Sequence, residues 1–359
     1  MNNLNMQCPI GFTGYGITSY NIYERLTKKD DLEIALFTMG PVSLDTEEGS
    51  QRLLQDVSRQ LSFDRRAPFL KIWHPHDLIQ RIGSGKYGAL VFFEIDKLKP
   101  VEINGVNALD TVFVASKWAK QILLDNGIST DIQVSPLGVN QNIFNTTIKH
   151  EAKEEENSNY IFLNIGKWEL RKGHDFLIEA FSQAFTAKDN VELWMISDNP
   201  FLTPEQTLAW KNLYRQSPLG NKIKIIDRLP TSLNLAAKIS QSDCGLFPSR
   251  GEGWNNEILE VMAMNKPVIA TNYSAHTEYL TPDNSYLVEV DNLTEAKDDK
   301  FFDGFGKWAH LEDRQYEQMI EHMRYVYKKG IRTNPIGVET SKRFSWTDTA
   351  DIIYNNLYH

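Results

Sequence analysis

Cysteine is scarce in this sequence. Its 359 residues include only two, Cys8 and Cys244, far apart and each inside an apolar run typical of a β-strand. Such surroundings suit a cysteine that acts as a small buried hydrophobe in a reducing compartment. We therefore expect two buried, reduced thiols rather than a disulfide or a metal-binding pair.

Long hydrophobic runs are also missing. No apolar stretch approaches the roughly 20 residues that a membrane-spanning helix needs. The first residues, Met1-Asn-Asn-Leu-Asn, contain neither the basic nor the apolar segment of a secretory signal peptide. These absences predict a cytoplasmic protein without a transmembrane segment.

Positive charge is in deficit. The chain carries 38 Lys and Arg against 47 Asp and Glu, a net charge of −9. This balance disfavours an extended nucleic-acid-binding surface, although a local basic cleft stays compatible with it. Internal repeats of solenoid length and low-complexity tracts are absent as well. The composition that remains, 41% hydrophobic and 24% charged, is that of an ordinary globular protein.

The length and the order of apolar runs predict two α/β domains. A chain of this length exceeds what one core usually supports. The charged segment 149–159 lacks apolar periodicity and is typical of an interdomain linker. On each side of it, short apolar runs alternate with helical patterns, which predicts parallel sheets covered on both faces. The expected strands are 5–10, 32–37, 69–73, 89–94, 111–115 and 132–134, then 160–165, 191–196, 223–226, 244–248 and 267–270.

One stretch, residues 248–270, combines features of a ligand site. A buried strand over 244–248 leads into a glycine-bearing loop and then a helix, with Asn255 or Asn256 as the N-cap. A strand–turn–helix of this kind binds anions, because free N–H groups and the helix dipole face the loop. Glu252 in the loop and Glu260 in the helix add carboxylates that suit hydroxyl groups. An anionic ligand rich in hydroxyls points to a sugar nucleotide.

A second glycine-bearing turn lies near the N-terminus. Residues 11–16 read Gly-Phe-Thr-Gly-Tyr-Gly between the first expected strand and a helix over 17–26. Glycines let the backbone approach a ligand closely and present N–H groups to anions. Many such turns are only tight, so the pattern by itself leaves both interpretations open.

Taken together and in this order, the motifs resemble those of the retaining glycosyltransferases of family 4, which have the GT-B fold. The strongest resemblance is Glu252-x7-Glu260, preceded by Pro248-Ser-Arg-Gly and followed by Lys266-Pro-Val-Ile-Ala-Thr and Glu278-Tyr-Leu. The other matching motifs are Gly166-Lys-Trp-Glu-Leu-Arg-Lys-Gly173 with 176–181, Pro136-Leu-Gly-Val-Asn140 with Phe144, and Gly14-x-Gly16. They cover nearly the whole chain.

The resemblance implies two Rossmann-like domains whose parallel sheets face each other across a cleft. Residues 1–150, joined by a C-terminal helix within 345–359 that returns to this domain, would form the acceptor side. Residues 151–344 would form the domain that binds the sugar-nucleotide donor. No cofactor is implied beyond the sugar nucleotide itself, with uridine diphosphate as the family's commonest carrier.

The resemblance also assigns roles to residues of the second domain. Glu260 would accept hydrogen bonds from both ribose hydroxyls, which suits a carboxylate with its two acceptor oxygens. Glu252 would bind hydroxyls of the donor sugar near the reacting carbon. Lys167 and Lys172 would flank the diphosphate and neutralise the charge that develops as it leaves. Backbone N–H groups at the helix start would assist, from Trp254, Asn255, Asn256 and Glu257.

In the first domain the resemblance points to a histidine and two glycines. His74 directly follows the expected strand 69–73, where the family often keeps an active-site histidine. His76 is the alternative, and either residue could instead be an ordinary loop histidine beside Pro75. Gly14 and Gly16 would let the backbone approach the donor.

Two departures from the family pattern stand at the donor site. Lys167 replaces a more common arginine, which keeps the positive charge but loses the planar fork. Asn255-Asn256-Glu257 replaces a glycine, an aliphatic residue and a proline, so the ribose contacts are better specified than those of the donor sugar. No Asp-x-Asp occurs in the sequence, so the metal clamp of the other glycosyltransferase fold is missing. The resemblance therefore implies metal-independent transfer.

The implied reaction retains the anomeric configuration. The acceptor hydroxyl would attack from the face that the diphosphate leaves, with a β-phosphate oxygen taking its proton, so no protein nucleophile of the glycosidase kind is needed. A sugar-nucleotide epimerase of the same architecture and a non-catalytic sugar-nucleotide-binding protein are the alternatives. The acceptor stays open among a glycan, a lipid-linked sugar, a protein and a modified nucleic acid. Aromatic residues that either line an acceptor groove or belong to the core are Phe12, Tyr15, Tyr20, Trp73 and Phe93.

Overall fold

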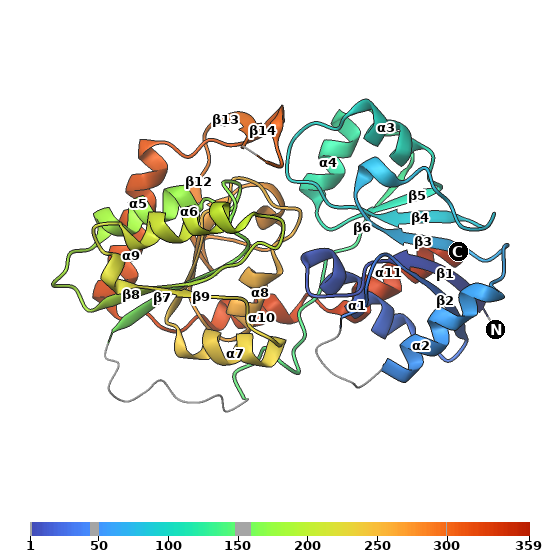
Figure 1. Cartoon of the computed structure of the whole chain (residues 1–359), viewed down its shortest axis with the longest axis horizontal. Helices are drawn as coiled ribbons and strands as arrows, with labels where there is room; N and C mark the ends of the chain where they lie inside the picture. Colours follow the sequence, from blue (N-terminus) through green and yellow to red (C-terminus); the bar gives the residue numbers. More distant parts are fainter. Residues whose placement is uncertain (1, 44–49, 148–158, 299) are drawn as a thin grey trace. The chain divides into compact units, whose positions relative to one another are not determined.

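A computed structural model describes residues 2–43, 50–147, 159–298 and 300–359 of the chain (Figure 1). The chain divides into two compact units, Met1–Gly138 with Phe344–His359, and Val139–Arg343. This boundary falls earlier than the one expected at residue 150. The charged segment 149–159 was predicted to be a linker, and its residues 149–158 lie outside the described part of the chain.

The first unit is built on a six-stranded parallel sheet with the strand order β2-β1-β3-β4-β5-β6. The strands are β1 (Asn2–Cys8), β2 (Leu32–Thr38), β3 (Phe69–Ile72), β4 (Tyr87–Leu90), β5 (Thr111–Val114) and β6 (Asp131–Val134). The helices are α1 (Gly14–Leu26), α2 (Ser50–Ser58), α3 (Pro100–Asn107), α4 (Lys117–Asp125) and α11 (Trp346–Tyr358), with short 3₁₀ turns η1 (Arg59–Leu61) and η2 (Pro75–Asp77). Because β2 and β3 lie on opposite sides of β1, the order reverses between β1 and β3, the usual place for a ligand in such sheets.

The C-terminal helix α11 belongs to the first unit. It packs beside α1, and Thr349 Oγ1 donates a 2.6 Å hydrogen bond to the carbonyl oxygen of Pro136. Near the end of α11, the hydroxyl of Tyr358 donates a 2.6 Å hydrogen bond to the carbonyl oxygen of Asn3. These two bonds connect α11 to β1 and to the segment that follows β6.

The second unit holds another six-stranded parallel sheet, with the order β12-β11-β10-β7-β8-β9. Its strands are β7 (Tyr160–Ile165), β8 (Val191–Ile196), β9 (Ile223–Ile226), β10 (Cys244–Phe247), β11 (Val268–Asn272) and β12 (Tyr286–Glu289). Its helices are α5 (His174–Ala184), α6 (Pro204–Arg215), α7 (Ser232–Gln241), α8 (Asn256–Ala263), α9 (Asp313–Lys329) and α10 (Pro335–Lys342), with 3₁₀ turns η3 (Gly220–Lys222) and η4 (Ser274–Glu278). Here the order reverses between β7 and β10.

Helices cover both faces of the second sheet. In Figure 1, α5 and α6 lie on one side of the sheet and α7 and α8 on the other, as expected for right-handed crossovers in opposite directions. A core cluster lies between the sheet and the α5 and α9 helices, with Phe162, Phe176 and Phe181 fully buried. The prediction of two α/β Rossmann-like domains with parallel sheets is confirmed.

Both cysteines are buried free thiols, as the sequence predicted. Burial raises the pKa of the Cys8 thiol to about 12, because a thiolate would be desolvated there. Cys8 ends β1 and Cys244 begins β10, so each acts as a small core residue.

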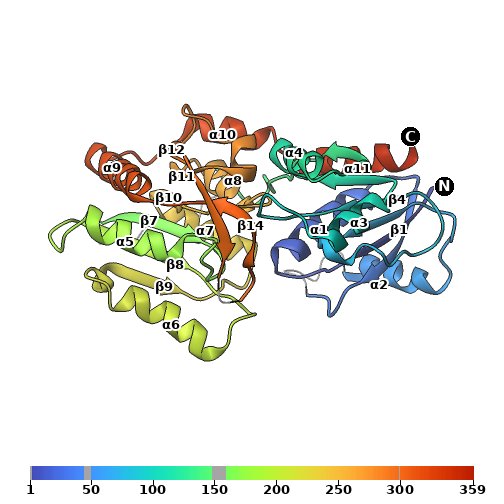
Figure 2. The ribbon, with the colours of Figure 1, turned by 90° about the horizontal axis from the view of Figure 1, so that it is seen from above.

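Several elements differ from the sequence expectation. The expected helix 45–60 is α2 followed by η1, and residues 44–49 lie outside the described part of the chain. Helices α3, α6 and α10 were not expected, because each is short or buries little; α6 buries only Tyr214. The segment 291–310 contains an antiparallel hairpin, β13 (Leu293–Lys297) with β14 (Asp303–Ala309), and β14 is labelled in Figure 2.

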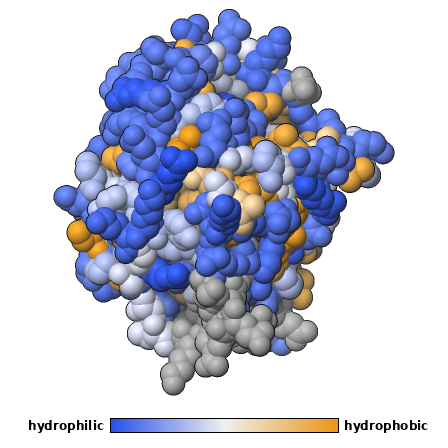
Figure 3. All heavy atoms as spheres, turned by 90° about the vertical axis from the view of Figure 1, so that its left-hand side faces the viewer, coloured by the Kyte–Doolittle hydropathy of each residue, from blue (hydrophilic) through white to orange (hydrophobic). Residues whose placement is uncertain are grey.

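The molecular surface is mainly hydrophilic where Figure 3 shows it, with hydrophobic residues scattered in small patches. Within the described ranges, no helix combines the length and the apolar character needed to cross a membrane.

Candidate functional site

The predicted donor residues gather at the carboxyl ends of β7 and β10, where the strand order of the second unit reverses. These strands are hydrogen-bonded neighbours, with Cys244 opposite Phe162. The loop after β7 covers residues 166–173, and the loop after β10 covers 248–255. Parallel neighbours place both loops at the same edge of the sheet, which is where open α/β sheets bind ligands.

Close backbone approach joins the two loops. The N–H of Arg250 donates a 2.6 Å hydrogen bond to the carbonyl oxygen of Arg171. A Cβ atom on Gly173, whose φ is 71°, would lie 2.0 Å from the carbonyl oxygen of Pro248. Only glycine therefore fits at this crossing. The loop after β11 joins too, since the Glu252 N–H donates to Ser274 Oγ at 2.9 Å.

Glu252 is the centre of a buried ionic cluster. Its Oε1 lies 2.8 Å from Lys172 Nζ, and its Oε2 lies 2.8 Å from Arg171 Nη1. All three residues are at least nine-tenths buried. Arg171 Nη1 also donates a 2.8 Å hydrogen bond to the carbonyl oxygen of Gly251, so the guanidinium is fixed to the loop that carries Glu252.

A second carboxylate completes this cluster. Glu169 Oε2 accepts hydrogen bonds from Nε and Nη2 of Arg171 at 3.0 and 2.7 Å. Its Oε1 lies 2.8 Å from Nζ of Lys167, whose side chain is 41% exposed. Lys167 and Lys172 are therefore linked through Glu169, Arg171 and Glu252, with Lys167 at the solvent end.

The charges hold one another in their ionised forms. Burial by itself would raise the pKa of Glu252, but Arg171 and Lys172 hold it well below its ordinary range. Burial by itself would lower the pKa of Lys172, but the Glu252 and Glu257 carboxylates raise it above its ordinary value. A cluster of this kind is costly to break, because removing one member leaves a buried charge without its partner.

Helix α8 begins without a side-chain cap. Asn255 occupies the N-cap position, as predicted, but in the left-handed region with φ at 76°. Its Nδ2 instead donates a 3.0 Å hydrogen bond to Nε2 of His276, whose Nδ1 donates to the carbonyl oxygen of Thr271 at 2.9 Å. Burial lowers the pKa of His276 to about 4, so the ring is neutral and can accept that bond.

The helix start offers further groups to a ligand. Oδ1 of Asn255 and Oδ1 of Asn256 are buried and accept no hydrogen bond from another described residue. The side chain of Trp254 is buried, and its ring lies 5.1 Å from that of Tyr279. The first N–H groups of an uncapped helix, together with its dipole, attract anions.

Glu260 lies on α8, one turn after Glu257. Its side chain is half-buried, and no hydrogen bond or ion pair joins its carboxylate to another described residue. Burial, assisted by the nearby Glu257 charge, raises the pKa of Glu260 to about 8. An unengaged carboxyl at this position can accept hydrogen bonds from hydroxyl groups of a ligand.

The remaining predicted residues meet at the corresponding edge of the first unit. Gly14 and Gly16 begin α1, after β1, and His74 follows β3, the neighbour of β1 across the switch point. Gly16 lets the helix approach the preceding turn, since a Cβ there would lie 2.6 Å from N and O of Gly11. The hydroxyl of Tyr15 lies 3.5 Å from Nδ1 of His74. The ring of the exposed His76 stacks on His74 at 5.3 Å.

The aromatic candidates for an acceptor groove divide into two groups. Phe93 is 7% exposed and belongs to the core of the first unit, so it lines no open groove. Tyr15, Tyr20 and Trp73 are half-buried, and Phe12 is exposed. In the described residues, no three His, Cys, Asp or Glu side chains are grouped as metal ligands.

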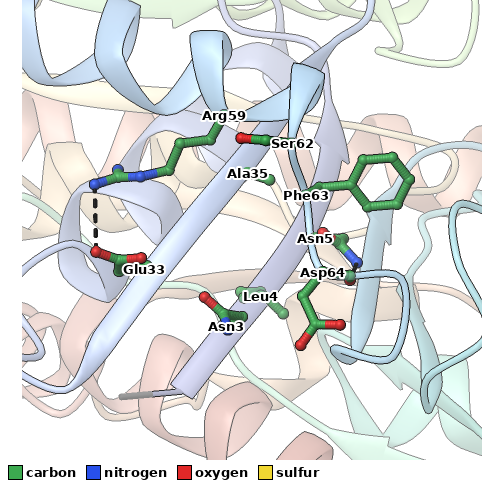
Figure 4. A pocket seen from close by; sticks show the side chains of 9 residues that line it. All are labelled: Asn3, Leu4, Asn5, Glu33, Ala35, Arg59, Ser62, Phe63 and Asp64. Carbon is green, nitrogen blue, oxygen red and sulfur yellow. Dashed lines mark hydrogen bonds and ion pairs between the residues drawn. The ribbon is translucent and has the colours of Figure 1, made fainter.

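A cavity of about 130 Å³ lies elsewhere in the first unit (Figure 4). Segments of β1, β2 and the turn after η1 surround it, and Arg59 and Glu33 form a 3.6 Å ion pair at its side. No predicted site residue lines this cavity. It is separate from the switch-point residues described above.

The family model that matches this chain by sequence falls within the second unit. Residues 159–299 match the family model described as glycosyl transferases group 1. An uncharacterised glycosyltransferase of Methanocaldococcus jannaschii is 25% identical over 157 residues, which is 42% of this chain and 36% of that protein. The match thus spans about a third of the curated relative.

Solved structures match the whole chain. Sucrose-phosphate synthase from Thermosynechococcus elongatus gives a TM-score of 0.73 at 14% identity, covering 100% of this chain and 99% of that one. HepE of Anabaena, solved with UDP and glucose, gives 0.71 at 14% identity, covering 99% of each. A glycosyltransferase from Rickettsia africae gives 0.67 at 17% identity, covering 99% and 97%.

The fold is GT-B. The match to the family model of glycosyl transferases group 1, in a chain with this fold, supports a glycosyltransferase. Two residues at its switch point were missed by sequence reasoning: Arg171 and Glu169, which stand inside the matched motif 166–173 but carry no assigned role there. The signal that could have found them is their charge, since Glu169 and Arg171, in the loop after a buried strand, must be paired if they are buried.

Proposed function

We propose that this protein is a retaining, metal-independent glycosyltransferase that moves a sugar from a nucleotide-diphosphate donor to an acceptor hydroxyl. The observation that carries the proposal is the pairing of Glu252 with Lys172 and Arg171 at the β7–β10 switch point. It provides an ionised carboxylate for sugar hydroxyls beside a charged amine for phosphate oxygens. UDP as the carrier is supported by the UDP complex of HepE.

Each group has a defined task in this proposal. The Lys172 ammonium has three N–H donors, so it can donate to the diphosphate while one donor stays on Glu252. Lys167, exposed at the other end of the cluster, meets the same diphosphate, and the uncapped start of α8 adds N–H groups. These positive groups stabilise the charge that grows on the leaving group. Glu260 accepts hydrogen bonds from the ribose hydroxyls.

The chemistry needs no protein nucleophile. The acceptor hydroxyl attacks the anomeric carbon from the face that the diphosphate leaves, the bond to the diphosphate breaks, and the acceptor proton passes to a β-phosphate oxygen. Glu252 orients the donor sugar through its hydroxyls during this step. Gly14, Gly16 and His74 are proposed to contact the donor or the acceptor from the first unit. No cofactor is proposed, and the cytoplasmic location stays a prediction.

Release of the nucleoside diphosphate tests the proposal. Purified protein is incubated with UDP-glucose, UDP-galactose or UDP-N-acetylglucosamine, with and without EDTA. We expect one donor to release UDP slowly in the absence of any acceptor. NMR of the sugar first released should show the anomeric configuration of the donor. The rate of UDP release should be the same with and without EDTA. Formation of an epimeric UDP-sugar without UDP release would instead identify an epimerase. Binding of a donor without any turnover would identify a non-catalytic sugar-nucleotide-binding protein.

A further inference from the structure

Two exposed phenylalanine rings form an aromatic corner in the second unit. The side chains of Phe201 and Phe301 are 51% and 42% exposed, and their ring centroids lie 6.3 Å apart with the planes at 83°. Phe201 lies in the loop between β8 and α6, and Phe301 lies in the hairpin β13–β14. Exposed aromatic rings that meet in this way are unusual on a polar surface and commonly mark a contact site.

Hydrogen bonds fix the backbone that carries the two rings. Oδ1 of Asp298 accepts bonds from the backbone N–H groups of Lys300 at 2.8 Å and Phe301 at 2.6 Å. The N–H of Phe201 donates to Oδ1 of Asn199 at 3.1 Å, and Nδ2 of Asn199 donates to the carbonyl oxygen of Trp168 at 3.0 Å. The backbone N–H groups of Phe201 and Phe301 are therefore fixed by hydrogen bonds, which lowers the entropy lost when a ligand stacks on the rings.

The aromatic corner adjoins the proposed donor site through Lys167. Its Nζ lies 5.4 Å from the centroid of Phe201 and 5.9 Å from that of Phe301, within the range of cation–π attraction. At the other end of the hairpin, the N–H of Ala309 donates a 2.8 Å hydrogen bond to the carbonyl oxygen of Arg250, in the loop that carries Glu252. The hairpin thus connects the corner to both loops of the site.

The position of the corner argues against the nucleobase as its ligand. Phe201 leads into α6, whereas Glu260 lies on α8, and these helices cover opposite faces of the sheet (Figure 1). If Glu260 binds the ribose, the ribose lies beside α8, and neither Phe201 nor Phe301 belongs to α8 or to the loop before it. The donor sugar is assigned to Glu252, which is buried among the loops after β7, β10 and β11. The aromatic corner is therefore available to a ring other than the nucleobase or the donor sugar.

We propose that Phe201 and Phe301 stack against a pyranose ring of the acceptor, so that the acceptor is a carbohydrate or carries one. This rests on the proposed glycosyltransferase function. One face of a pyranose presents C–H groups that pack on an aromatic ring, while its hydroxyls remain free to meet water and polar side chains. Lys167 adds a polar partner at the edge of the stack.

Direct sugar binding tests this inference without requiring catalysis. The probes are the methyl pyranosides of glucose, galactose, mannose and N-acetylglucosamine, each added to UDP-saturated protein and followed by saturation-transfer NMR. We expect at least one probe to receive saturation at its ring C–H protons. In Phe201→Ala and Phe301→Ala, the Kd for that probe should rise about five- to tenfold, the loss expected for one aromatic stack. Phe301→Tyr should keep the wild-type Kd.

Tyr325→Ala is the matched control, because Tyr325 is an exposed aromatic (49%) of the same unit on α9. It should bind the probe as the wild type does, and it should keep the wild-type Kd for UDP and the wild-type rate of UDP release without acceptor. The inference is overturned if no probe binds, if the alanine variants bind probes as well as the wild type, or if they weaken UDP instead. Failure of the proposed function would be seen separately, because the wild-type protein would then release no UDP from any donor.

Discussion

Arg171 and Glu252 form a buried ion pair, with Nη1 of Arg171 2.8 Å from Oε2 of Glu252, although they are 81 residues apart in the chain. Arg171 follows β7 and Glu252 follows β10, so the pair exists only because these strands are neighbours in the sheet. The guanidinium of Arg171 has a second carboxylate partner, Glu169. Because Arg171 keeps Glu252 ionised, Lys172 can turn towards a phosphate without leaving Glu252 unpaired.

Removing Arg171 should destabilise the protein strongly. Arg171→Met keeps most of the side-chain length but leaves Glu169 and Glu252 buried with one cationic partner each. We expect the free energy of unfolding to fall by roughly 3 kcal/mol, as for other buried pairs that lose one member. Urea denaturation followed by circular dichroism measures this change. Arg314→Met is the control, since Arg314 and Asp291 form an exposed pair and should contribute less than about 1 kcal/mol. Equal losses in the two variants would contradict a special role for Arg171.

Glu252 and Glu260 should separate by their effects on steady-state kinetics. Glu252→Gln keeps the size of the side chain and should lower kcat by about a hundredfold, with little change in donor KM, because its contacts strengthen during sugar transfer. Glu260→Ala should instead raise donor KM by about tenfold through the lost hydrogen bonds to the ribose. Initial rates of UDP release at varied donor concentration distinguish the two outcomes. A Glu252→Gln enzyme with unchanged turnover would refute the role given to Glu252.

Stability should depend on pH through Glu260. Its pKa is about 8 in the folded protein, against an ordinary value of 4.5. Between these values the folded state binds more protons than the unfolded state, so stability is fully present below about pH 4.5 and is lost progressively as the pH rises through about 8. Glu260→Gln resembles the neutral form and should not show this loss.

The measurement is the free energy of unfolding of both proteins at several values of pH between 5 and 8.5. The advantage of Glu260→Gln over the wild type should grow as the pH rises. Glu321→Gln, at an exposed position of α9, should run parallel to the wild type. A constant difference between Glu260→Gln and the wild type across this range would show that Glu260 does not titrate there.

The two glycines that begin α1 should respond differently to alanine. A Cβ on Gly16 would lie 2.6 Å from backbone atoms of Gly11, so Gly16→Ala must displace the turn and should cost roughly 1 to 3 kcal/mol of unfolding free energy. A Cβ on Gly14 would meet nothing within 4 Å, so Gly14→Ala should change stability by less than about 1 kcal/mol. If Gly14 faces the donor, as proposed, Gly14→Ala should nevertheless raise donor KM. Similar losses of stability in both variants would contradict the packing argument for Gly16.

The alternation of apolar runs and helical patterns determined the two parallel sheets, because strands buried on both faces must be continuously apolar. The same reasoning placed nine of the twelve sheet strands to within two residues, namely β2, β3 and β5 to β11, and placed β1 and β4 less closely. It missed elements that bury little. The α6 helix begins at a capping box of Thr203 and Gln206 and packs few apolar side chains, so its periodicity is weak. The hairpin β13–β14 is short, and its two strands show no regular alternation of apolar and polar residues.

By itself, the sequence determined that Glu252, Glu260 and the lysines of the motif 166–173 belong to loops and a helix that follow apolar strands. It could not determine which charges share a contact, because that depends on the order of the strands in the sheet. The tertiary structure placed β7 beside β10 and so paired Arg171 and Lys172 with Glu252, while Glu260 was left without a partner among the described residues. The aromatic corner of Phe201 and Phe301 likewise joins segments 100 residues apart, which only folding brings together.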